Sequence, residues 1–306
     1  MKVLWVLENI RTNLNSYGNY IDNKLDVLLL LASVYLWKKN HPEDHCVLYA
    51  DDLTINYLDK IKLLYFWDYI QPVLPSSKRI NKDVFWASSK VEVLSKVNEP
   101  VIIMDHDTHV YKPIKHLLNP DTTYVCNYEI GEHYYPTNYD SYIKRLTPRE
   151  RFKTDSCNVS FLYLPDPEFT KIYANKSLDM MEQFTKMNVP DPQYLIFAEQ
   201  LLLRHLLDKN NIKHNSIIST YWDCDKRQWG KNHKKGLFDY PHSNKTFLHY
   251  GTLKGEIRHN MNGFNYENVC KSLLNMMNLS TLQLWINYGC LGIVLLMEED
   301  AILILY

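Results

Sequence analysis

This chain of 306 residues contains few glycines and few cysteines, and its net charge is close to zero. With only 9 glycines, the chain is neither collagen-like nor of low complexity. The six cysteines are scattered and form no C-x-x-C pair, which argues against a zinc ribbon or a disulfide framework and favours free thiols in a reducing cytoplasm. The 34 basic and 35 acidic residues leave a net charge of -1, so bulk charge does not favour nucleic acid or membrane as a partner.

Long apolar runs are missing as well. The N-terminal run MKVLWVLENI reaches Glu8 too early for the apolar core of a signal peptide. The apolar run from Cys290 to Met297 is too short to span a bilayer. We therefore expect no transmembrane segment and a cytoplasmic location. The chain does hold 46% hydrophobic residues, enough for a large core in one large α/β domain or two medium ones.

The first third of the chain alternates strand and helix patterns. Strands are predicted at 2–7, 45–50 and 100–104, and helices at 22–40, 58–67 and 85–97. Strands separated by helices indicate right-handed crossovers and an α/β fold with a doubly wound, mostly parallel central sheet flanked by helices. In such sheets, ligands bind at the carboxyl ends of the strands, near the point where the strand order reverses.

The second half of the chain is less regular. It predicts strands at 124–127 and 159–164, a helix at 193–207, a strand that ends at His249 and a mobile loop at 132–151. The last segment, 282–306, is unusually apolar. We expect it to pack as a core helix and strand rather than to contact a partner or a membrane surface.

The sharpest local feature is the acidic pair in VIIMDHDTHV. Asp105 and Asp107 follow an apolar strand, and in extended backbone two residues at this spacing point the same way. The carboxylates would repel each other unless a cation lies between them, and oxygen ligands select Mg²⁺ or Mn²⁺. The alternative is that the pair caps a loop or a helix. Isolated charges beside a buried strand are costly, which favours the metal site.

Four short segments, the acidic pair among them, carry a wider resemblance. In chain order they are FWASSK at 85–90, MDHD at 104–107, CNVSFLYLP at 157–165 and FLHYGTLKG at 247–255. Together they resemble the GT-A fold glycosyltransferases, in particular the glycogenin-like and lipopolysaccharide galactosyltransferase group. The resemblance implies a GT-A-like fold and a nucleotide-sugar donor, a UDP-sugar in the first instance, and it favours retention of the anomeric configuration.

The resemblance also implies roles for individual residues. Lys90 would contact the donor, Asn158 would face the sugar, and Lys254 would bind the donor diphosphate. His249 would be the third metal ligand, and an imidazole added to two carboxylates favours Mn²⁺. We also assign His106, between the two aspartates, to donor binding. The alternatives are a structural histidine at 249 and an exposed loop lysine at 254.

Two polar residues follow the first two predicted strands. Asn9 and Asp51 occupy the positions from which GT-A folds contact the base and the ribose of the donor. An aspartate suits a ribose hydroxyl, as it does in dinucleotide-binding folds. Both residue types are also common in turns, which is the alternative.

Glu199 is the candidate group at the acceptor. On a helix, its neighbours three and four residues away are all apolar: Leu195, Ile196, Leu202 and Leu203. A buried carboxylate needs a partner or a function, and burial would raise its pKa. In GT-A enzymes, a comparable acidic residue contacts the acceptor. A structural ion pair is the alternative, and Asp191, which could equally cap the helix, is the second candidate.

The sequence therefore predicts a metal-dependent glycosyltransferase, a hexosyl or pentosyl transferase, that moves a sugar to an acceptor hydroxyl. Residues 1–127 would form the nucleotide-sugar-binding half and 128–306 the acceptor-binding half of one domain. The basic runs at 144–153 and 221–236 suit a glycan or a modified DNA base as acceptor, although solvated loops explain them too. Two rival functions stay open: a non-catalytic nucleotide- or sugar-binding module, and a metal-dependent phosphohydrolase, for which His109 is the nearby candidate for a further ligand.

Overall fold

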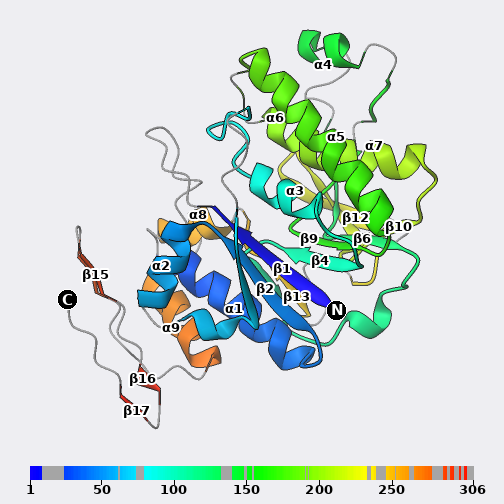
Figure 1. Cartoon of the computed structure of the whole chain (residues 1–306). Coiled ribbons are helices and arrows are strands. Elements are labelled where there is room, and N and C mark those ends of the chain that lie inside the picture. The colour runs from blue at the N-terminus through cyan, green and yellow to red at the C-terminus, as the bar shows by residue number, and fades with distance from the viewer. Residues whose placement is uncertain are drawn as a thin grey trace.

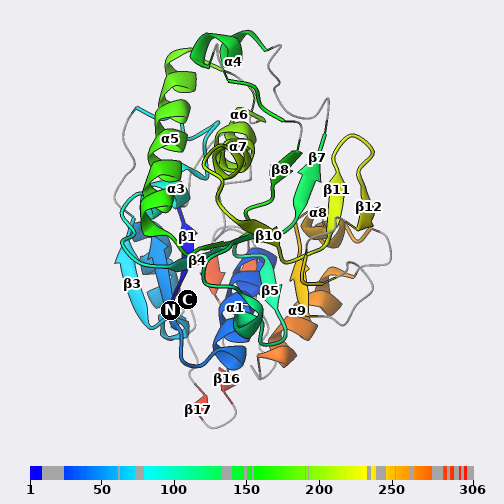
Figure 2. The same ribbon diagram turned by 90° about the vertical axis from the view of Figure 1, so that its right-hand side faces the viewer.

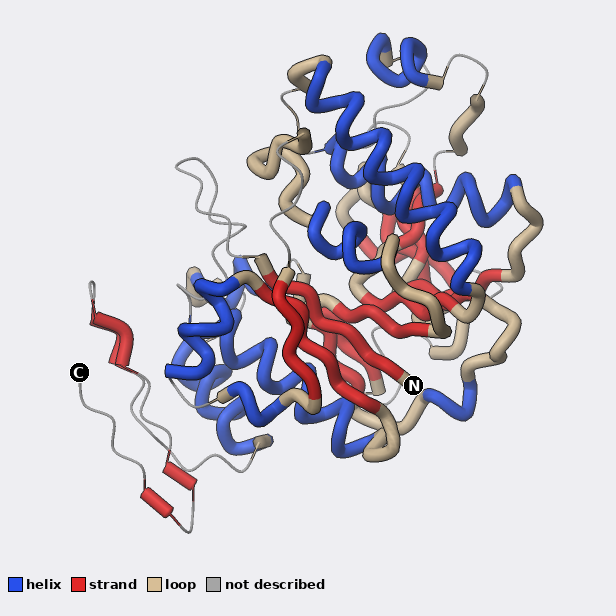
Figure 3. The backbone as a smooth tube through the Cα atoms, in the orientation of Figure 1, coloured by secondary structure: helices blue, strands red, loops and turns tan. Residues whose placement is uncertain are grey.

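A computed structural model of the chain describes residues 1–8, 24–60, 63–73, 79–131, 140–147, 150–153, 155–189, 191, 193–232, 236–238, 246–251, 253–261, 265–277, 285–287, 290–292, 296–297 and 300–301. Figure 3 shows how helices, strands and loops follow one another along the backbone. Within these ranges, no helix is both long enough and apolar enough to cross a membrane.

A central sheet of seven strands organises the molecule. In order across the sheet they are β3 (Tyr69–Pro72), β2 (His45–Ala50), β1 (Lys2–Leu7), β4 (Val101–Met104), β9 (Phe161–Leu164), β6 (Thr123–Val125) and β10 (His214–Ser216). Neighbours pair in parallel except at β9, which runs antiparallel to both β4 and β6. The predicted mostly parallel, doubly wound sheet is confirmed. The strand order reverses between β1 and β4, so their carboxyl ends form the switch point at which α/β sheets bind ligands.

Helices cover both faces of this sheet (Figures 1 and 2). On one face lie α1 (Lys24–Asn40), α2 (Asp52–Lys60) and α9 (Tyr266–Met276), and on the other lie α3 (Ser88–Leu94), α5 (Pro167–Lys186) and α7 (Leu202–Lys209). Alternate residues of β1 serve the two sides, as the period of two in a strand requires. Val3 and Trp5 pack in the cluster around α1, and Leu4 packs in the cluster around α5.

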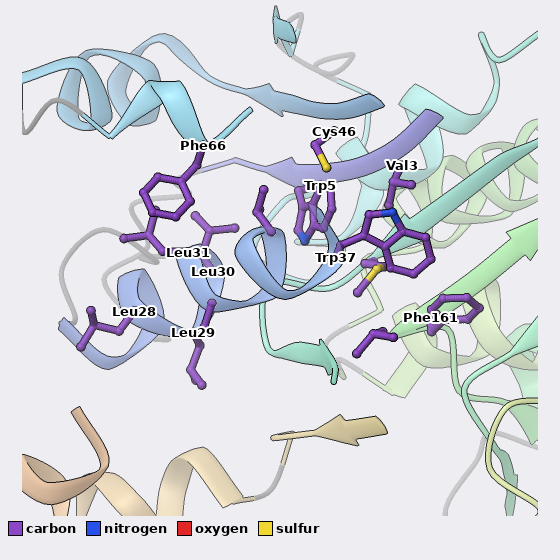
Figure 4. Packing of buried hydrophobic residues seen from close by; sticks show 14 of the residues in the cluster. Val3, Trp5, Leu28, Leu29, Leu30, Leu31, Trp37, Cys46, Phe66 and Phe161 are labelled. Atoms are coloured by element: carbon purple, nitrogen blue, oxygen red, sulfur yellow. The ribbon is translucent and has the colours of Figure 1, made fainter. Parts of the chain in front are cut away.

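Helix α1 is apolar on most sides because it is covered on most sides. It packs against β1, against α9 and against β5 (Thr108–Val110), and Figure 4 shows its side of the core. The Trp5 indole donates a hydrogen bond of 2.9 Å to the Ser33 hydroxyl, which donates one of 2.6 Å to the carbonyl of Thr108. This chain of hydrogen bonds ties β1 and α1 to the segment that follows the acidic pair.

Smaller sheets complete the fold. A second sheet has the order β12 (Gln228–Asn232), β11 (Thr220–Asp223), β7 (Tyr128–Ile130) and β8 (Asp155–Cys157). Strand β13 (Phe247–His249) pairs with β5 in antiparallel fashion. Two hairpins near the C-terminus join β14 (Trp285–Asn287) to β15 (Cys290–Gly292) and β16 (Leu296–Met297) to β17 (Asp300–Ala301). The side chains of 282–306 lie outside the described residues, so the packing of this segment stays a prediction.

Some predicted elements were wrong. In place of a helix over 58–67, the chain forms α2 immediately after β2 and a short 3-10 helix, η3 (Leu64–Phe66). The predicted loop over 132–151 contains α4 (Ser141–Leu146), and the sequence analysis also missed α5, whose first turn is capped by the Asp166 carboxylate. Strand β9, from the second half of the chain, lies between β4 and β6, so the two halves share one sheet.

Candidate functional site

A pocket of about 290 Å³ opens at the carboxyl ends of β1 and β4, where the strand order reverses. Its lining comes from five parts of the chain. They are Glu8 after β1, Trp86 and Lys90 around α3, the segment Asp105–Asp107 after β4, Glu199 with Gln200, and the segment from His249 to Lys254. Ligand binding at the switch point was predicted, and the chain gathers most of its candidate residues there.

Strand β13 brings His249 to the acidic pair. The antiparallel register sets His249 opposite Thr108, and the Tyr250 amide donates to the carbonyl of Asp107 at 2.9 Å. As a result, His249 Nε2 lies 3.6 Å from Asp107 Oδ1. One donor atom from each of Asp105, Asp107 and His249 lies within 4.8 Å of the other two. The three predicted metal ligands are therefore close enough together to share one ion.

This donor set suits a particular kind of cation. Two carboxylate oxygens and one imidazole nitrogen match Mn²⁺ or Mg²⁺ better than a thiolate-seeking metal. Asp107 is almost fully buried, whereas the Asp105 side chain is 36% exposed and lines the pocket. Coordination by Asp105 is therefore compatible with access for a substrate.

Gly251 leaves room for the ring of His249. A Cβ at Gly251 would lie 3.0 Å from His249 Cε1 and 3.2 Å from Nε2. Any larger residue would push the imidazole away from its present place. The atoms nearest to such a Cβ all belong to the His249 ring, so the missing side chain serves the histidine.

Lys254 pairs directly with the acidic pair. It belongs to α8 (Leu253–Arg258), and its Nζ is 2.6 Å from Asp107 Oδ2. Burial would raise the pKa of Asp107, but the charges of Lys254 and the two nearby histidines outweigh it and hold that pKa below its ordinary value. The Asp107 carboxylate is therefore an anion at neutral pH.

Lys90 is enclosed by protein oxygens. Its Nζ lies 2.8 Å from Asp105 Oδ1, 3.0 Å from the carbonyl of Val159 and 3.3 Å from Glu199 Oε1. Burial would lower the pKa of Lys90, but the two carboxylates raise it above its ordinary value. Lys90, which the resemblance assigns to the donor, therefore contacts two carboxylates of the pocket, Asp105 and Glu199.

Glu199 reaches the pocket from an irregular helix. The predicted helix over 193–207 consists of α6 (Gln193–Ile196), the π-helical turn η5 (Phe197–Leu201) and α7. Turns of this kind are common at functional sites. Burial raises the pKa of Glu199 above its ordinary value, although the charge of Lys90 acts to lower it. This is the direction of the pKa shift that the sequence predicted. Glu199 Oε1 accepts no hydrogen bond within the described part of the chain.

Other predicted residues lie elsewhere or are held locally. Asn158 donates to Glu129 Oε1 at 2.7 Å and accepts from the Ser160 amide at 3.1 Å, and it is not among the residues that line the pocket. Asp51 accepts from the Thr54 amide at the start of α2. Asp191 is exposed and accepts from the Gln193 amide at 2.8 Å. Asn9 lies outside the described residues. These contacts fit the turn-forming alternative for Asp51 and the helix-capping alternative for Asp191.

The sequence analysis missed a buried carboxylate behind the site. Asp26 pairs with Arg258 of α8, and its Oδ1 lies 3.5 Å from His106 Nε2. His106 lines the pocket and is 3.4 Å from Lys254 Nζ. The sequence does contain a signal for Asp26, because this aspartate lies inside the apolar stretch KLDVLLLL. Gln200 was also missed, although its Oε1 is buried with no hydrogen-bond partner in the described ranges.

His109 does not extend the cluster. It is fully buried on β5, its Nε2 lies 2.9 Å from the carbonyl of Leu29, and burial lowers its pKa to about 4. The grouping of candidate ligands in the described residues contains Asp105, Asp107 and His249 without it. The extra ligand that a phosphohydrolase would need is therefore not supplied by His109.

Comparisons with known proteins give the following matches. The galactosyltransferase LgtC, solved with donor and acceptor sugar analogues, is 10% identical over 70% of this chain and 73% of its own, with a TM-score of 0.36. The glycosyltransferase GlyE of Streptococcus pneumoniae TIGR4 is 11% identical over 70% of this chain and 44% of its own, with a TM-score of 0.38. The PaToxG glycosyltransferase is 12% identical over 68% of this chain and 69% of its own, with a TM-score of 0.40.

Among curated proteins, none matches this sequence. A protein family, in contrast, matches residues 1–277, which is most of the chain. The chain belongs to this family, DUF6734, which is described as a family of unknown function.

Proposed function

We propose that this protein is a metal-dependent glycosyltransferase that moves a sugar from a nucleoside-diphosphate sugar to an acceptor hydroxyl. The observation that carries the proposal is the convergence of Asp105, Asp107 and His249 within 4.8 Å, in a pocket that also holds Lys254 and Glu199. A divalent ion and a lysine beside an open pocket are what a diphosphate leaving group requires.

Asp105, Asp107 and His249 would hold the cation. A bound Mn²⁺ or Mg²⁺ ion would supply positive charge to the diphosphate as the bond to the sugar breaks. Lys254 would add a second positive charge from the other oxygen of Asp107, since it lines the pocket and 20% of its side chain is exposed. We favour a UDP-sugar as donor, and retention of configuration, on the resemblance of the motifs.

Glu199 would act on the other side of the sugar. It is buried, it lines the pocket, and its raised pKa suits a carboxylate that accepts or orients a proton. Lys90 would hold both Glu199 and Asp105 in position rather than touch the donor. Asn9, Asp51 and Asn158 remain proposed donor contacts.

The acceptor is proposed to be a glycan. The basic runs that could suit DNA are partly neutralised in place, since Lys226 pairs with Asp223 at 2.8 Å and Lys153 with Asp208 at 2.7 Å. A hexosyl or pentosyl transfer in the cytoplasm is consistent with this view.

The experiment is a donor-hydrolysis assay, which needs no known acceptor. A panel of UDP-sugars is incubated with the protein and Mn²⁺, and release of UDP is followed. Asp107→Asn should reduce release by about a hundredfold or more, because it removes a ligand and a charge on which the leaving group depends. Lys171→Met, which removes a half-buried lysine of α5 paired with Glu168 and distant in sequence from the pocket residues, is the matched control and should behave like wild type.

Chelation provides the second arm of this test. Excess EDTA should stop UDP release, and added Mn²⁺ should restore it. Undiminished turnover in EDTA, or in the Asp107→Asn variant, would contradict the proposed metal role.

A further inference from the structure

Each carboxylate of the candidate metal site already engages a lysine, but the two lysines are held differently. Lys90 is enclosed by three protein oxygens and only 10% of its side chain is exposed. Lys254 pairs with one carboxylate, Asp107, lies 3.4 Å from His106 Nε2, and has 20% of its side chain exposed. Lys254 therefore has fewer anionic partners than Lys90 and is the lysine better placed to exchange one for a ligand.

The helix that carries Lys254 is anchored at a second point. Arg258 follows Lys254 by four residues, so the two side chains lie on the same face of α8. Arg258 pairs with the buried carboxylate of Asp26 at the start of α1, while Lys254 pairs with Asp107. The Arg258–Asp26 pair can hold the helix while the flexible four-carbon stem of Lys254 changes direction.

The charges in the pocket explain why such an exchange would be favoured. Of the carboxylates that line it, Glu8 is paired with Lys82, and Asp105, Asp107 and Glu199 share Lys90 and Lys254. A divalent cation on Asp107 would lie close to the Lys254 ammonium in a poorly screened interior, where like charges repel strongly. A diphosphate brings the negative charge to which that ammonium can turn.

We propose that Lys254 couples the binding of the metal to the binding of the donor: its ammonium stays on Asp107 until a diphosphate enters, then moves to the phosphate and leaves Asp107 to the cation. The inference rests on the proposed function, because it takes the metal and the diphosphate as the ligands of this pocket. It makes Lys254 a positioning residue for the metal as well as a phosphate contact. The two ligands then bind cooperatively, each improving the affinity for the other.

Calorimetric titration of Mn²⁺, with and without saturating UDP, tests this coupling without any turnover. In the wild type, UDP should tighten Mn²⁺ binding by roughly tenfold or more. In Lys254→Met, Mn²⁺ alone should bind roughly tenfold more tightly than to the wild type, because the competing charge is gone, and the gain from UDP should shrink by a similar factor. Lys254→Arg keeps the charge and should keep the wild-type pattern, as should Lys171→Met on α5.

The outcomes separate the coupling from the site itself. If Mn²⁺ binding is lost in Asp107→Asn but is the same or weaker in Lys254→Met than in wild type, the metal site stands and the coupling is overturned. If Mn²⁺ does not bind, or binds equally well to Asp107→Asn, the proposed metal site fails and the coupling fails with it. Should Lys254→Met not fold, Lys254→Gln serves in its place. The wild-type titration is decisive even without a variant, since a Mn²⁺ affinity that UDP leaves unchanged contradicts the coupling.

Discussion

The ring of His249 rests against the backbone of Gly251, and this contact limits the directions in which the proposed third metal ligand can point. In Gly251→Ala, the new Cβ would lie 3.0 Å from Cε1 of the ring, so the imidazole must shift by a few tenths of an ångström. We expect Mn²⁺ to bind about tenfold more weakly, as when a group that orients a metal ligand is changed, with little effect on the unfolding temperature.

A second variant shows whether this effect passes through the histidine. His249→Ala should weaken Mn²⁺ binding on its own, and Gly251→Ala should add little to it, because the ring on which the methyl group presses is gone. Calorimetry on both single variants and on the double variant measures this. Full additivity would mean that Gly251 acts by some route other than the His249 ring.

Some site residues were predictable because they lie at strand ends. Asp105 and Asp107 follow an apolar strand, and His249 ends another strand. The predicted extended backbone across the two aspartates was wrong, since the chain turns there and the Thr108 amide donates to the carbonyl of Asp105 at 3.1 Å. The partners of Lys90 were not predictable, since Asp105, Val159 and Glu199 come from three separate segments that only the fold brings together. No feature near position 90 in the sequence distinguishes a donor contact from an enclosed ion pair.

Helix α8 is short, and it is held by Ile257, which is fully buried in the core, and by the ion pair between Arg258 and Asp26. Arg258→Met would leave the buried Asp26 carboxylate without its main cation, and we expect a loss of about 2 kcal/mol in the free energy of unfolding, below the cost for a fully buried pair. In the double variant Asp26→Asn with Arg258→Met, part of that loss should return because no charge is left unpaired. Urea unfolding at pH 7 measures both. Lys153→Met, which breaks an exposed pair, is the control and should cost well under about 1 kcal/mol.

The pH dependence of the same pair gives a further check at the level of the helix. Burial would raise the pKa of Asp26, but His106, Lys254 and Arg258 together hold it below its ordinary value of 3.8. A carboxylate whose pKa is depressed by folding adds stability above its unfolded pKa and loses it as the pH falls through the folded pKa. The difference between wild type and Arg258→Met should therefore be constant near neutrality and shrink below about pH 4. A difference that persists unchanged at pH 3 would assign the loss to packing instead of charge.

Element boundaries were harder to predict than element types. The strands β1, β2 and β4 were predicted within one residue because buried parallel strands are short apolar runs. The direction of β9 could not be predicted, because an apolar run reads the same whether the strand is parallel or antiparallel. The π-helical turn at Glu199 was equally hidden, since the apolar spacing around it fits an ordinary helix.

At the scale of the whole molecule, the two halves of the chain depend on each other through the central sheet. Strand β6 belongs to residues 1–127, yet within the described sheet its neighbours are β9 and β10, both from the second half. On the face of β1 and β2 that carries Leu4 and Val47, α3 of the first half packs against β1, and α5, with Tyr173 and Phe184, packs against α3 in the same cluster. A fragment of residues 1–127 would therefore lose the part of this cluster that follows residue 128 and leave β6 without its partners in the described sheet.

We expect that fragment to be largely unfolded and the full chain to unfold in a single transition. The missing part of the cluster removes several large aromatic and aliphatic contacts, and each fully buried side chain of that size contributes about 2 kcal/mol, which is a large share of the stability of a domain. Circular dichroism of the fragment and coincident urea transitions by circular dichroism and tryptophan fluorescence in the full chain check the two statements. A fragment that melts cooperatively would show that the first half holds its own core, and two separated transitions in the full chain would show the same for both halves. Because the pocket takes Asp105 from the first half and Glu199 and His249 from the second, a shared transition also means that the site forms and is lost together with the fold.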